Sequence, residues 1–515
     1  MSSLDSEFNY FQTALESNDG IVLADCKSKL LWSDGGIEIE VALILMANTL
    51  IIYKAGGNAG YKRALNLNSV VGVHEVATKS SNKATSMKLY QYELPPNKGC
   101  LSRGQSRERR RCEHTFVFPD SEQCALWCNK MNSLLGNPNS NGFVKKYLVF
   151  VNPVSGTGQG KTIYEKTVKG MLKEARIESV PILTERQNHA FDIVKDKKFD
   201  LDQYAAIVII GGDGLLYEVV NGIAERGLAG MEILKTIPLA PIPGGTGNGL
   251  AKSVLFECDD ECYSAKSATF LAIKGSSSPF DLSEVATTTE TKYAFLSMSW
   301  GLISDLDIRS EWMRCIGEIR LHLAAFYFML RRKQYQGRLL LRLAKAEEAD
   351  SSDGSINKNK NKNNEGSLDE IHPLFGNDFV AETPKHLLKI ISGSFQLIWV
   401  VQTPFASGST YSGPGVELND GLLTVFVVQG LSRCELLQLL LDVDSGAHIN
   451  RTGVQTYKCH AYRIEPFLDT EDDTSEKEDR GIFALDGECI DGPMIGPVQG
   501  KVLPGGARIM KIMKL

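Results

Sequence analysis

The sequence predicts an α/β nucleotide-binding domain followed by a β-sandwich domain, with a small β module before both. Between residues 144 and 276, short runs of Val, Ile and Leu alternate with helical patterns, which is typical of a parallel sheet covered by helices. From residue 277 to 515, strand patterns dominate, and we expect one helix, near 311–332, to interrupt them. This second pattern favours a sandwich.

The composition is that of a globular protein and excludes several functional classes. The chain has 515 residues and a formal net charge of −6, which argues against a general nucleic-acid-binding protein. We expect neither a signal peptide, because MSSLDSEFNY is polar, nor a membrane-spanning helix, because every apolar run is too short. The 11 cysteines complete no zinc-binding pattern, so we expect free thiols and a cytoplasmic protein.

Residues 1–21 are predicted to form a tail and residues 22–136 a β module closed by one helix. Alternating patterns such as IEIEVALILMA precede DSEQCALWCNKMNSLLG, where Asp120 or Ser121 can cap the helix and Gly136 can follow its end. Several strands and one closing helix with an inward Trp127 resemble a pleckstrin-homology-like module. A plain accessory β domain fits the same pattern.

A basic run lies within this module. The segment SRGQSRERRRCEH contains Arg103, Arg107 and 109–111, which could bind anionic lipid headgroups at a membrane surface. A solvated loop is the alternative interpretation. Residues 137–143, rich in Asn, read as a linker.

The α/β region contains three glycine-rich turns, each directly after a strand pattern. They are SGTGQG at 155–160, GGDG at 211–214 and GGTGN at 244–248. The carboxyl ends of such strands meet at the ligand-binding edge of the sheet, where bare backbone N–H groups suit phosphate. The spacing is neither that of a Walker A motif nor that of a Rossmann fingerprint. Asp213 could act as a base, bind a metal or cap the helix that follows it.

The region from 277 onward contains an apolar stretch with two carboxylates, WGLISDLDI. If this stretch is extended, Asp305 and Asp307 point to one face and could pair with a cation; a helix-capping role is the alternative. The predicted helix near 311–332 could pack on the sandwich or cover a lipid tail. Polar, low-complexity segments near 347–370 and 469–480 read as insertions.

The order NP, GGDG, PGGTGN resembles the catalytic domain shared by diacylglycerol, ceramide and sphingosine kinases, from about Lys146 onward. LTERQNHA, GGDGLLYEVVNG, SWGLISDLDIRSEWMRCIGEIR and FALDGE look most like sphingosine kinase. The N-terminal module also resembles that of plant-type long-chain base kinases. The resemblance implies ATP-dependent phosphorylation of the primary hydroxyl of sphingosine and related sphingoid bases, with Mg²⁺ accompanying ATP. It also implies a lipid-binding sandwich and peripheral membrane association, and it allows a homodimer.

The resemblance assigns roles to particular residues. Asp213 matches the family's general base, and Asp307 matches the acidic residue that recognises the sphingoid head group. The other substrate-contacting positions match Gly211, Gly212, Gly214, Leu302, Ile303, Leu306 and Leu321. The ATP-contacting positions match Asn152, Pro153, Val154, Ser155, Gly156, Thr184, Glu185, Arg186, Gln187, Asn188, Gly212, Gly245, Thr246, Arg314, Arg320, Asp486, Gly487 and Glu488. No dedicated protein metal site is expected.

One position departs from the family pattern. Val154 stands where animal sphingosine kinases have Arg, so a basic nucleotide contact is missing there. The alternatives are a ceramide or diacylglycerol kinase and a catalytically silent lipid-binding adaptor. NAD kinase also has a GGDG turn, but FALDGE and the apolar stretch argue against it.

Overall fold

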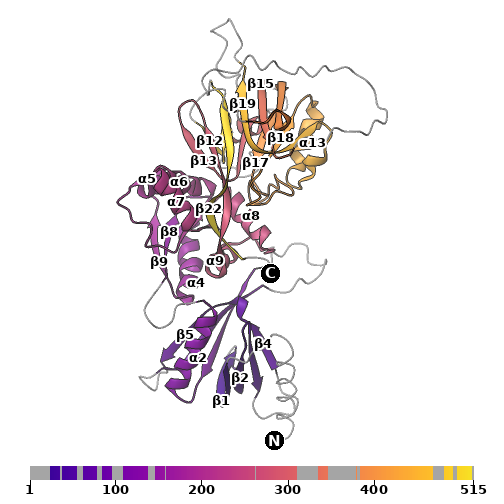
Figure 1. The fold of residues 1–515 in the computed structure, drawn as a ribbon. Helices are drawn as coiled ribbons and strands as arrows, with labels where there is room; N and C mark the ends of the chain where they lie inside the picture. The colour runs from indigo at the N-terminus through magenta and orange to yellow at the C-terminus, as the bar shows by residue number, and fades with distance from the viewer. Residues whose placement is uncertain are drawn as a thin grey trace. The chain divides into compact units, whose positions relative to one another are not determined.

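The computed structural model divides the chain into two compact units, described separately below (Figure 1). Unit 1 comprises 1–148, 162–180 and 261–275, and unit 2 comprises 149–161, 181–260 and 276–515. The residues that the structure describes are 24–34, 37–54, 62–77, 84–94, 108–136, 145–156, 158–260, 262–309, 334–345, 379, 383–467, 481–490 and 496–512.

Unit 1 contains a seven-stranded antiparallel sheet in the order β4-β3-β2-β1-β7-β6-β5. Its strands are β1 (Ala24–Asp34), β2 (Ile37–Leu45), β3 (Thr49–Lys54), β4 (Lys62–Asn66), β5 (Val70–Ala77), β6 (Ala84–Glu93) and β7 (Arg110–Val117). Arg110 and Arg111 of the basic run therefore lie in a strand rather than in a loop. The short 3-10 helix η1 (Leu67–Ser69) precedes β5.

The helix α2 (Ser121–Leu134) closes this sheet as predicted. Asp120 caps it by accepting a hydrogen bond from the backbone N–H of Gln123 at 2.8 Å, and Gly136 follows in the left-handed conformation, with φ +67°. Trp127 is buried in the sheet's hydrophobic core, 6.3 Å from the ring of Phe118. The predictions for the cap, for Gly136 and for Trp127 are confirmed.

The remaining helices of unit 1 come from the α/β region. The helix α3 (Gly160–Ile163) continues through the π-helical turn η3 (Tyr164–Val168) into α4 (Lys169–Glu174), and α9 (Ala265–Lys274) also belongs to this unit. The sequence pattern KTIYEKTVKGMLKEA, residues 161–175, indicates one helix, and the structure interrupts it with this π-helical turn. The π-helical turn adds a residue to the hydrogen-bonded ring and so shifts the side chains that follow it.

The α/β sheet has the order β9-β8-β10-β11-β22 and lies mainly in unit 2, with residues 145–148 of β8 and 177–180 of β9 in unit 1. β10 pairs in parallel with β11, and β11 pairs in parallel with β22 through Leu239 and Ile509. The elements here are β8 (Lys145–Val151), β9 (Ile177–Leu183), α5 (His189–Lys195), β10 (Ala206–Gly211), α6 (Asp213–Ala224), α7 (Leu228–Thr236), β11 (Leu239–Pro243) and α8 (Gly249–Glu257). The short helix α7 directly follows Gly227.

The rest of unit 2 is the sandwich-like region, whose order is β21-β20-β14-β17-β18-β19-β22 with β12, β13, β15 and β16 attached. The long strand β22 pairs with β12, β19 and β11, so it joins this region to the α/β sheet. The strands of the sandwich-like region are β12 (Ser276–Ala286), β13 (Thr291–Ala294), β14 (Ser297–Gly301), β15 (Tyr335–Leu343), β16 (Leu388–Phe395), β17 (Leu397–Val401), β18 (Leu423–Val428), β19 (Val454–Pro466), β20 (Phe483–Leu485), β21 (Glu488–Cys489) and β22 (Val498–Lys511).

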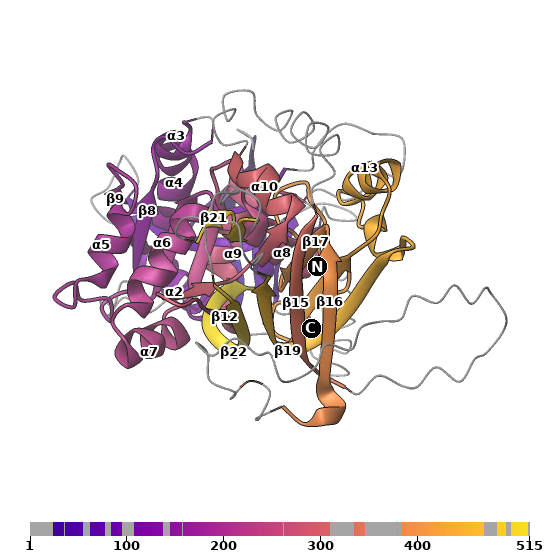
Figure 2. The same cartoon turned by 90° about the horizontal axis from the view of Figure 1, so that it is seen from above.

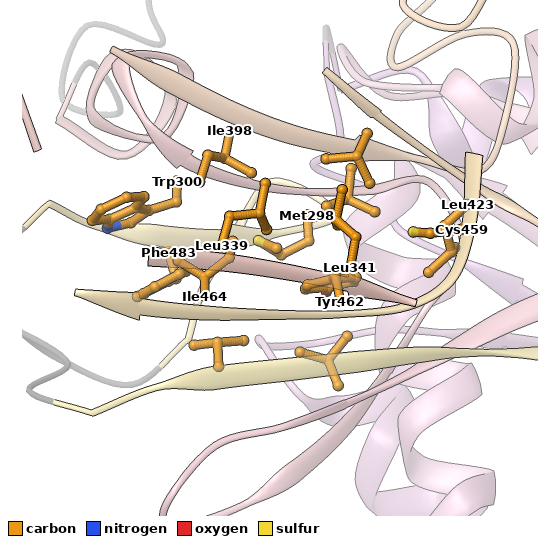
Figure 3. Packing of buried hydrophobic residues seen from close by; sticks show 14 of the residues in the cluster. Met298, Trp300, Leu339, Leu341, Ile398, Leu423, Cys459, Tyr462, Ile464 and Phe483 are labelled. Carbon is orange, nitrogen blue, oxygen red and sulfur yellow. The ribbon is translucent and has the colours of Figure 1, made fainter. Parts of the chain in front are cut away.

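Two apolar clusters stabilise this region. In the first, Trp300 stacks on Phe483 with ring centroids 5.8 Å apart, and Leu339 and Ile464 pack nearby (Figure 3). The second lies between β17, β18 and the helix α13 (Arg433–Asp442). Figure 2 shows the ribbons of β17 and α13. Burial of each large apolar side chain contributes about 1.5–3 kcal/mol.

The prediction of one interrupting helix in this region was wrong. The structure contains α13, which begins with a complete capping box between Ser432 and Glu435, and α10 (Leu302–Arg309), while the predicted helix near 311–332 lies outside the described residues. Short 3-10 helices are η6 (Lys385–Leu387) and η7 (Ala447–Asn450). In the described parts of the chain, every helix is too short or too polar to cross a bilayer.

Candidate active site

The three glycine-rich turns meet in unit 2, as the sequence predicted. A Cβ on Gly245 would lie 2.6 Å from the Cα of Gly212, and one on Gly156 would lie 2.9 Å from the carbonyl carbon of Gly245. Because backbone occupies that space, side chains at these positions would force the turns apart. The turns therefore form one continuous surface of nearly bare backbone, which suits a triphosphate.

Asp213 lies at the centre of this surface, as the first residue of α6. Its carboxylate accepts hydrogen bonds from the backbone N–H groups of Gly249 at 2.7 Å and Leu250 at 3.4 Å, at the start of α8. Asp213 thus caps the neighbouring helix and not its own, contrary to the capping alternative raised by the sequence. Burial raises the pKa of Asp213 to about 6, although the two N–H groups oppose the shift.

Asn248 shapes the third turn. Its side-chain oxygen accepts hydrogen bonds from the N–H groups of Gly244 and Gly245, at 3.2 and 3.1 Å, and its amide nitrogen donates to the Gly245 carbonyl at 2.6 Å. Thr246, beside it, is exposed. The site predicted from the sequence did not include Asn248, although its place after GGTG is a signal for such a turn.

The turn after β20 returns to this place from the far end of the sequence. The carboxylate of Asp486 accepts three backbone N–H groups, from Phe295, Leu296 and Ser297, at 2.8–2.9 Å. Burial raises the pKa of Asp486 to about 7. Its side chain therefore ties this turn to the start of β14 and to the two residues before it.

Glu488 approaches α6 from the same turn. A Cβ on Gly214 would lie 2.9 Å from a carboxylate oxygen of Glu488, so this side chain lies beside the residue that follows Asp213. Gly487, between Asp486 and Glu488 in the sequence, has φ +82°, a conformation that favours glycine. Three carboxylates, those of Asp213, Asp486 and Glu488, therefore lie in one part of the molecule.

The segment Thr184–Asn188 follows β9. Thr184 is buried and donates its N–H to the carbonyl of Val151, while the residues from 185 to 188 are exposed. His189 has a structural role here, because its Nδ1 accepts the N–H of Glu185 at 3.0 Å.

Glu218, which the sequence analysis missed, holds this segment in place from α6. Its carboxylate accepts the N–H groups of Asn188 at 2.9 Å and Ala190 at 3.2 Å, and Asn188 has φ +59°. A carboxylate at the N-terminus of α5 is also favoured by the helix dipole.

A cavity of about 270 Å³ opens next to this segment, between α5, α6 and β13. It combines aromatic, acidic, amide and basic groups and is lined by Asn188, Phe191, Asp192, Tyr217, Glu218, Asn221 and Lys292. Asn188 alone among these residues was predicted as a site residue.

The apolar stretch that contains Asp305 and Asp307 is helical in α10 and not extended. The condition under which both carboxylates were expected to point to one face is therefore not met. Asp305 is fully buried and accepts a hydrogen bond from the hydroxyl of Tyr335 at 2.7 Å. Leu302 and Ile303 pack in the apolar cluster under α13.

Several predicted site residues lie outside the described part of the structure. They are Arg314, Arg320 and Leu321, together with the side chains of Leu306 and Asp307. Val154 is 81% exposed, and its N–H donates to the side chain of Asn152 at 3.1 Å. Within the described residues, no group of three or more His, Cys, Asp or Glu side chains is arranged to hold a metal ion.

Comparison with known protein families defines the class of protein to which this chain belongs. Residues 146–285 match the diacylglycerol kinase catalytic domain, and residues 392–511 match the YegS C-terminal NAD kinase beta sandwich-like domain. A lipid kinase thus accounts for both the glycine-rich turns and the sandwich. Kinases of this family use ATP.

Similar proteins of known sequence identify a narrower family within this class of lipid kinases. Sphingosine kinase 1 of Arabidopsis thaliana is 31% identical over 395 residues, covering 76% of this chain and 77% of the relative. Sphingosine kinase 1 of Mus musculus is 32% identical, covering 70% and 89%, and that of Homo sapiens is 29% identical with the same coverage. The chain belongs to the sphingosine kinases, within the lipid kinases that carry a diacylglycerol kinase catalytic domain.

Proposed function

We propose that this chain transfers the γ-phosphoryl group of ATP to the primary hydroxyl of sphingosine and related sphingoid bases. The observation that carries the proposal is the environment of Asp213, a buried carboxylate at the junction of three backbone-lined turns. With a pKa of about 6, Asp213 is ionised at neutral pH and yet more basic than an exposed aspartate. The N–H groups of Gly249 and Leu250 orient it.

The phosphates of ATP would lie over the glycine-rich turns, where Ser155, Gly245 and Thr246 are available to them. The nucleoside would occupy the cavity beside Asn188, between Phe191 and Tyr217, whose aromatic rings suit a base and whose acidic neighbours suit ribose hydroxyls. Arg314 and Arg320 would neutralise the phosphates. The backbone here supplies the positioning on which phosphoryl transfer depends.

Mg²⁺ would accompany ATP and neutralise charge that develops on the transferred group. Glu488 is the acidic side chain whose placement against Gly214 suits contact with such an ion. Asp213 and Asp486 fit the role less well, because backbone N–H groups already occupy their oxygens. We therefore propose that triphosphate oxygens and water molecules supply most of the ligands of the Mg²⁺ ion.

The lipid would enter from the side of α10. The apolar cluster that includes Leu302 and Ile303 suits an alkyl chain, and Asp307 would pair with the ammonium of the head group. Ceramide and diacylglycerol lack this cation, so a carboxylate there would select against both. Because the carboxylate of Asp305 accepts a hydrogen bond from Tyr335, Asp307 is the better candidate to bind the ammonium.

A lipid substrate implies work at a membrane surface, and we propose a cytoplasmic protein that associates peripherally with membranes. The N-terminal sheet would be a pleckstrin-homology-like module: four strands in succession, three more, and one closing helix support this.

The decisive test replaces Asp213 with Asn and measures transfer from radiolabelled ATP to sphingosine, dihydrosphingosine, phytosphingosine, ceramide and diacylglycerol. Asn can still accept the N–H of Gly249, so the fold should persist while kcat falls by about 10²–10⁴. A folded variant with near-normal turnover would refute the base assignment. Asp307→Asn should lose activity on sphingoid bases selectively. Wild-type activity confined to ceramide or diacylglycerol would support those alternatives, and no activity on any lipid would support an adaptor.

A further inference from the structure

The N-terminal sheet contacts helices of the α/β region within unit 1, and one point of contact is very close. Gly72 of β5 lies against the last residue of α4: a Cβ there would lie 1.9 Å from the carbonyl oxygen of Glu174. No side chain fits in that space. By contrast, Gly170, on the same helix, has nothing within 4 Å of such a Cβ.

Glu174 is the polar centre of this contact, and each of three strands supplies it with one donor. Its carboxylate accepts hydrogen bonds from the hydroxyl of Tyr92 on β6 at 2.7 Å and from Nε of Arg111 on β7 at 2.8 Å. Its carbonyl accepts Nε2–H of His74 on β5 at 2.7 Å. The Glu174 side chain is only 15% exposed, so these donors replace much of its water.

A second set of contacts joins residues that flank the strands to α9. The guanidinium of Arg109 lies 3.8 Å from the ring centroid of Phe270, is buried, and donates to the carbonyl of Tyr92 at 3.1 Å. The ammonium of Lys274 donates to the carbonyl of Leu67 at 3.4 Å, and burial lowers the pKa of Lys274 to about 8. Charged groups are buried in this way where specific partners compensate them.

We infer that Arg109 and Arg111 hold the N-terminal module on α4 and α9, and that this docking, rather than the binding of anionic lipids, is the role of these two arginines of the basic run. Arg109 is covered by Phe270, and Arg111 is shared between Glu174 and Glu113, with nitrogen–oxygen distances of 2.7 and 2.9 Å. Both guanidinium groups would have to leave these partners before they could bind phosphate headgroups.

The test measures hydrogen exchange in the full-length protein, at the amides of β5 and of α9. Reversing one charge, in Arg111→Glu or Glu174→Arg, should raise exchange there about tenfold or more, because each places like charges together in a partly buried site. The double variant Arg111→Glu/Glu174→Arg should return exchange to within about threefold of wild type. Gly72→Val should act like the single reversals, and Gly170→Ala should change nothing.

Two results would overturn the inference. One is exchange that stays within about twofold in both single reversals, or that the double variant fails to restore. The other concerns phosphatidylserine vesicles: if Arg109→Ala/Arg111→Ala abolishes vesicle binding while exchange at β5 and α9 stays unchanged, the basic run serves the membrane. Vesicle binding that is independent of both arginines supports the docking role.

Discussion

The raised pKa of Asp213 makes the pH dependence of catalysis a direct test of its role as a base. With a pKa of about 6, the carboxylate is ionised in about 9% of molecules at pH 5 and about 99% at pH 8. An aspartate with the ordinary pKa of 3.8 would be about 94% ionised at pH 5. At saturating ATP and sphingosine, kcat should therefore fall about tenfold between pH 8 and pH 5, with a midpoint near 6.

Acid unfolding by the same groups would not produce this loss. Burial raises the folded-state pKa of Asp213 and Asp486 above the unfolded-state value, so folding takes up protons between about pH 4 and 7. Their contribution to the free energy of unfolding is therefore largest at low pH and declines as pH rises through this window. Circular dichroism at each pH provides the control for other groups.

Variants assign the titration to one residue. The residual activity of Asp213→Asn should be independent of pH between 5 and 8, and Asp486→Asn should keep the acid limb. A wild-type profile that is flat down to pH 5 would refute the reasoning. So would an acid limb that persists in Asp213→Asn, because the titrating group would then be another residue or the nucleotide.

Three further predictions follow from the site and the sandwich. Gly245→Ala should reduce ATP-dependent turnover at least tenfold, since overpacking against Gly212 costs about 1–3 kcal/mol, whereas Gly247→Ala, with its nearest contact at 3.6 Å, should be milder; equal effects would contradict this. Glu218→Ala should raise the KM for ATP about tenfold with a smaller change in kcat, because two N–H groups lose a charged acceptor; a change in kcat alone would speak against it. Ser432→Ala should lower the free energy of unfolding by about 1 kcal/mol in denaturant titrations without altering kcat, since it removes the N-cap of α13.

The meeting of the glycine-rich turns was predictable, because it follows from the order of strands and turns alone. The carboxyl ends of adjacent parallel strands share an edge, so GGDG and GGTGN had to lie close together. The cap at Asp120 and the buried Trp127 were also predictable, since both depend on residues near in sequence.

Roles that depend on distant partners were not predictable. That Asp213 caps α8, and that Asp486 binds N–H groups some 190 residues away, follows from tertiary placement and has no local pattern. The start of α13 was different: the spacing of Ser432 and Glu435 is a capping-box signal that could have been read. The prediction for Asp305 and Asp307 required an extended backbone, and the local backbone is helical, so its condition is not met.

The pairing of β22 has a consequence for how the protein is made. One neighbour of β11 in the sheet is β22, which comprises residues 498–511. During synthesis, that edge of β11 therefore stays exposed while more than 250 further residues leave the ribosome. An unpaired edge in a buried-type sheet is a site where nascent chains associate wrongly. Folding of the nucleotide-binding sheet is therefore expected to be completed late, and chaperones that shield strand edges should matter more for its yield than for its final stability.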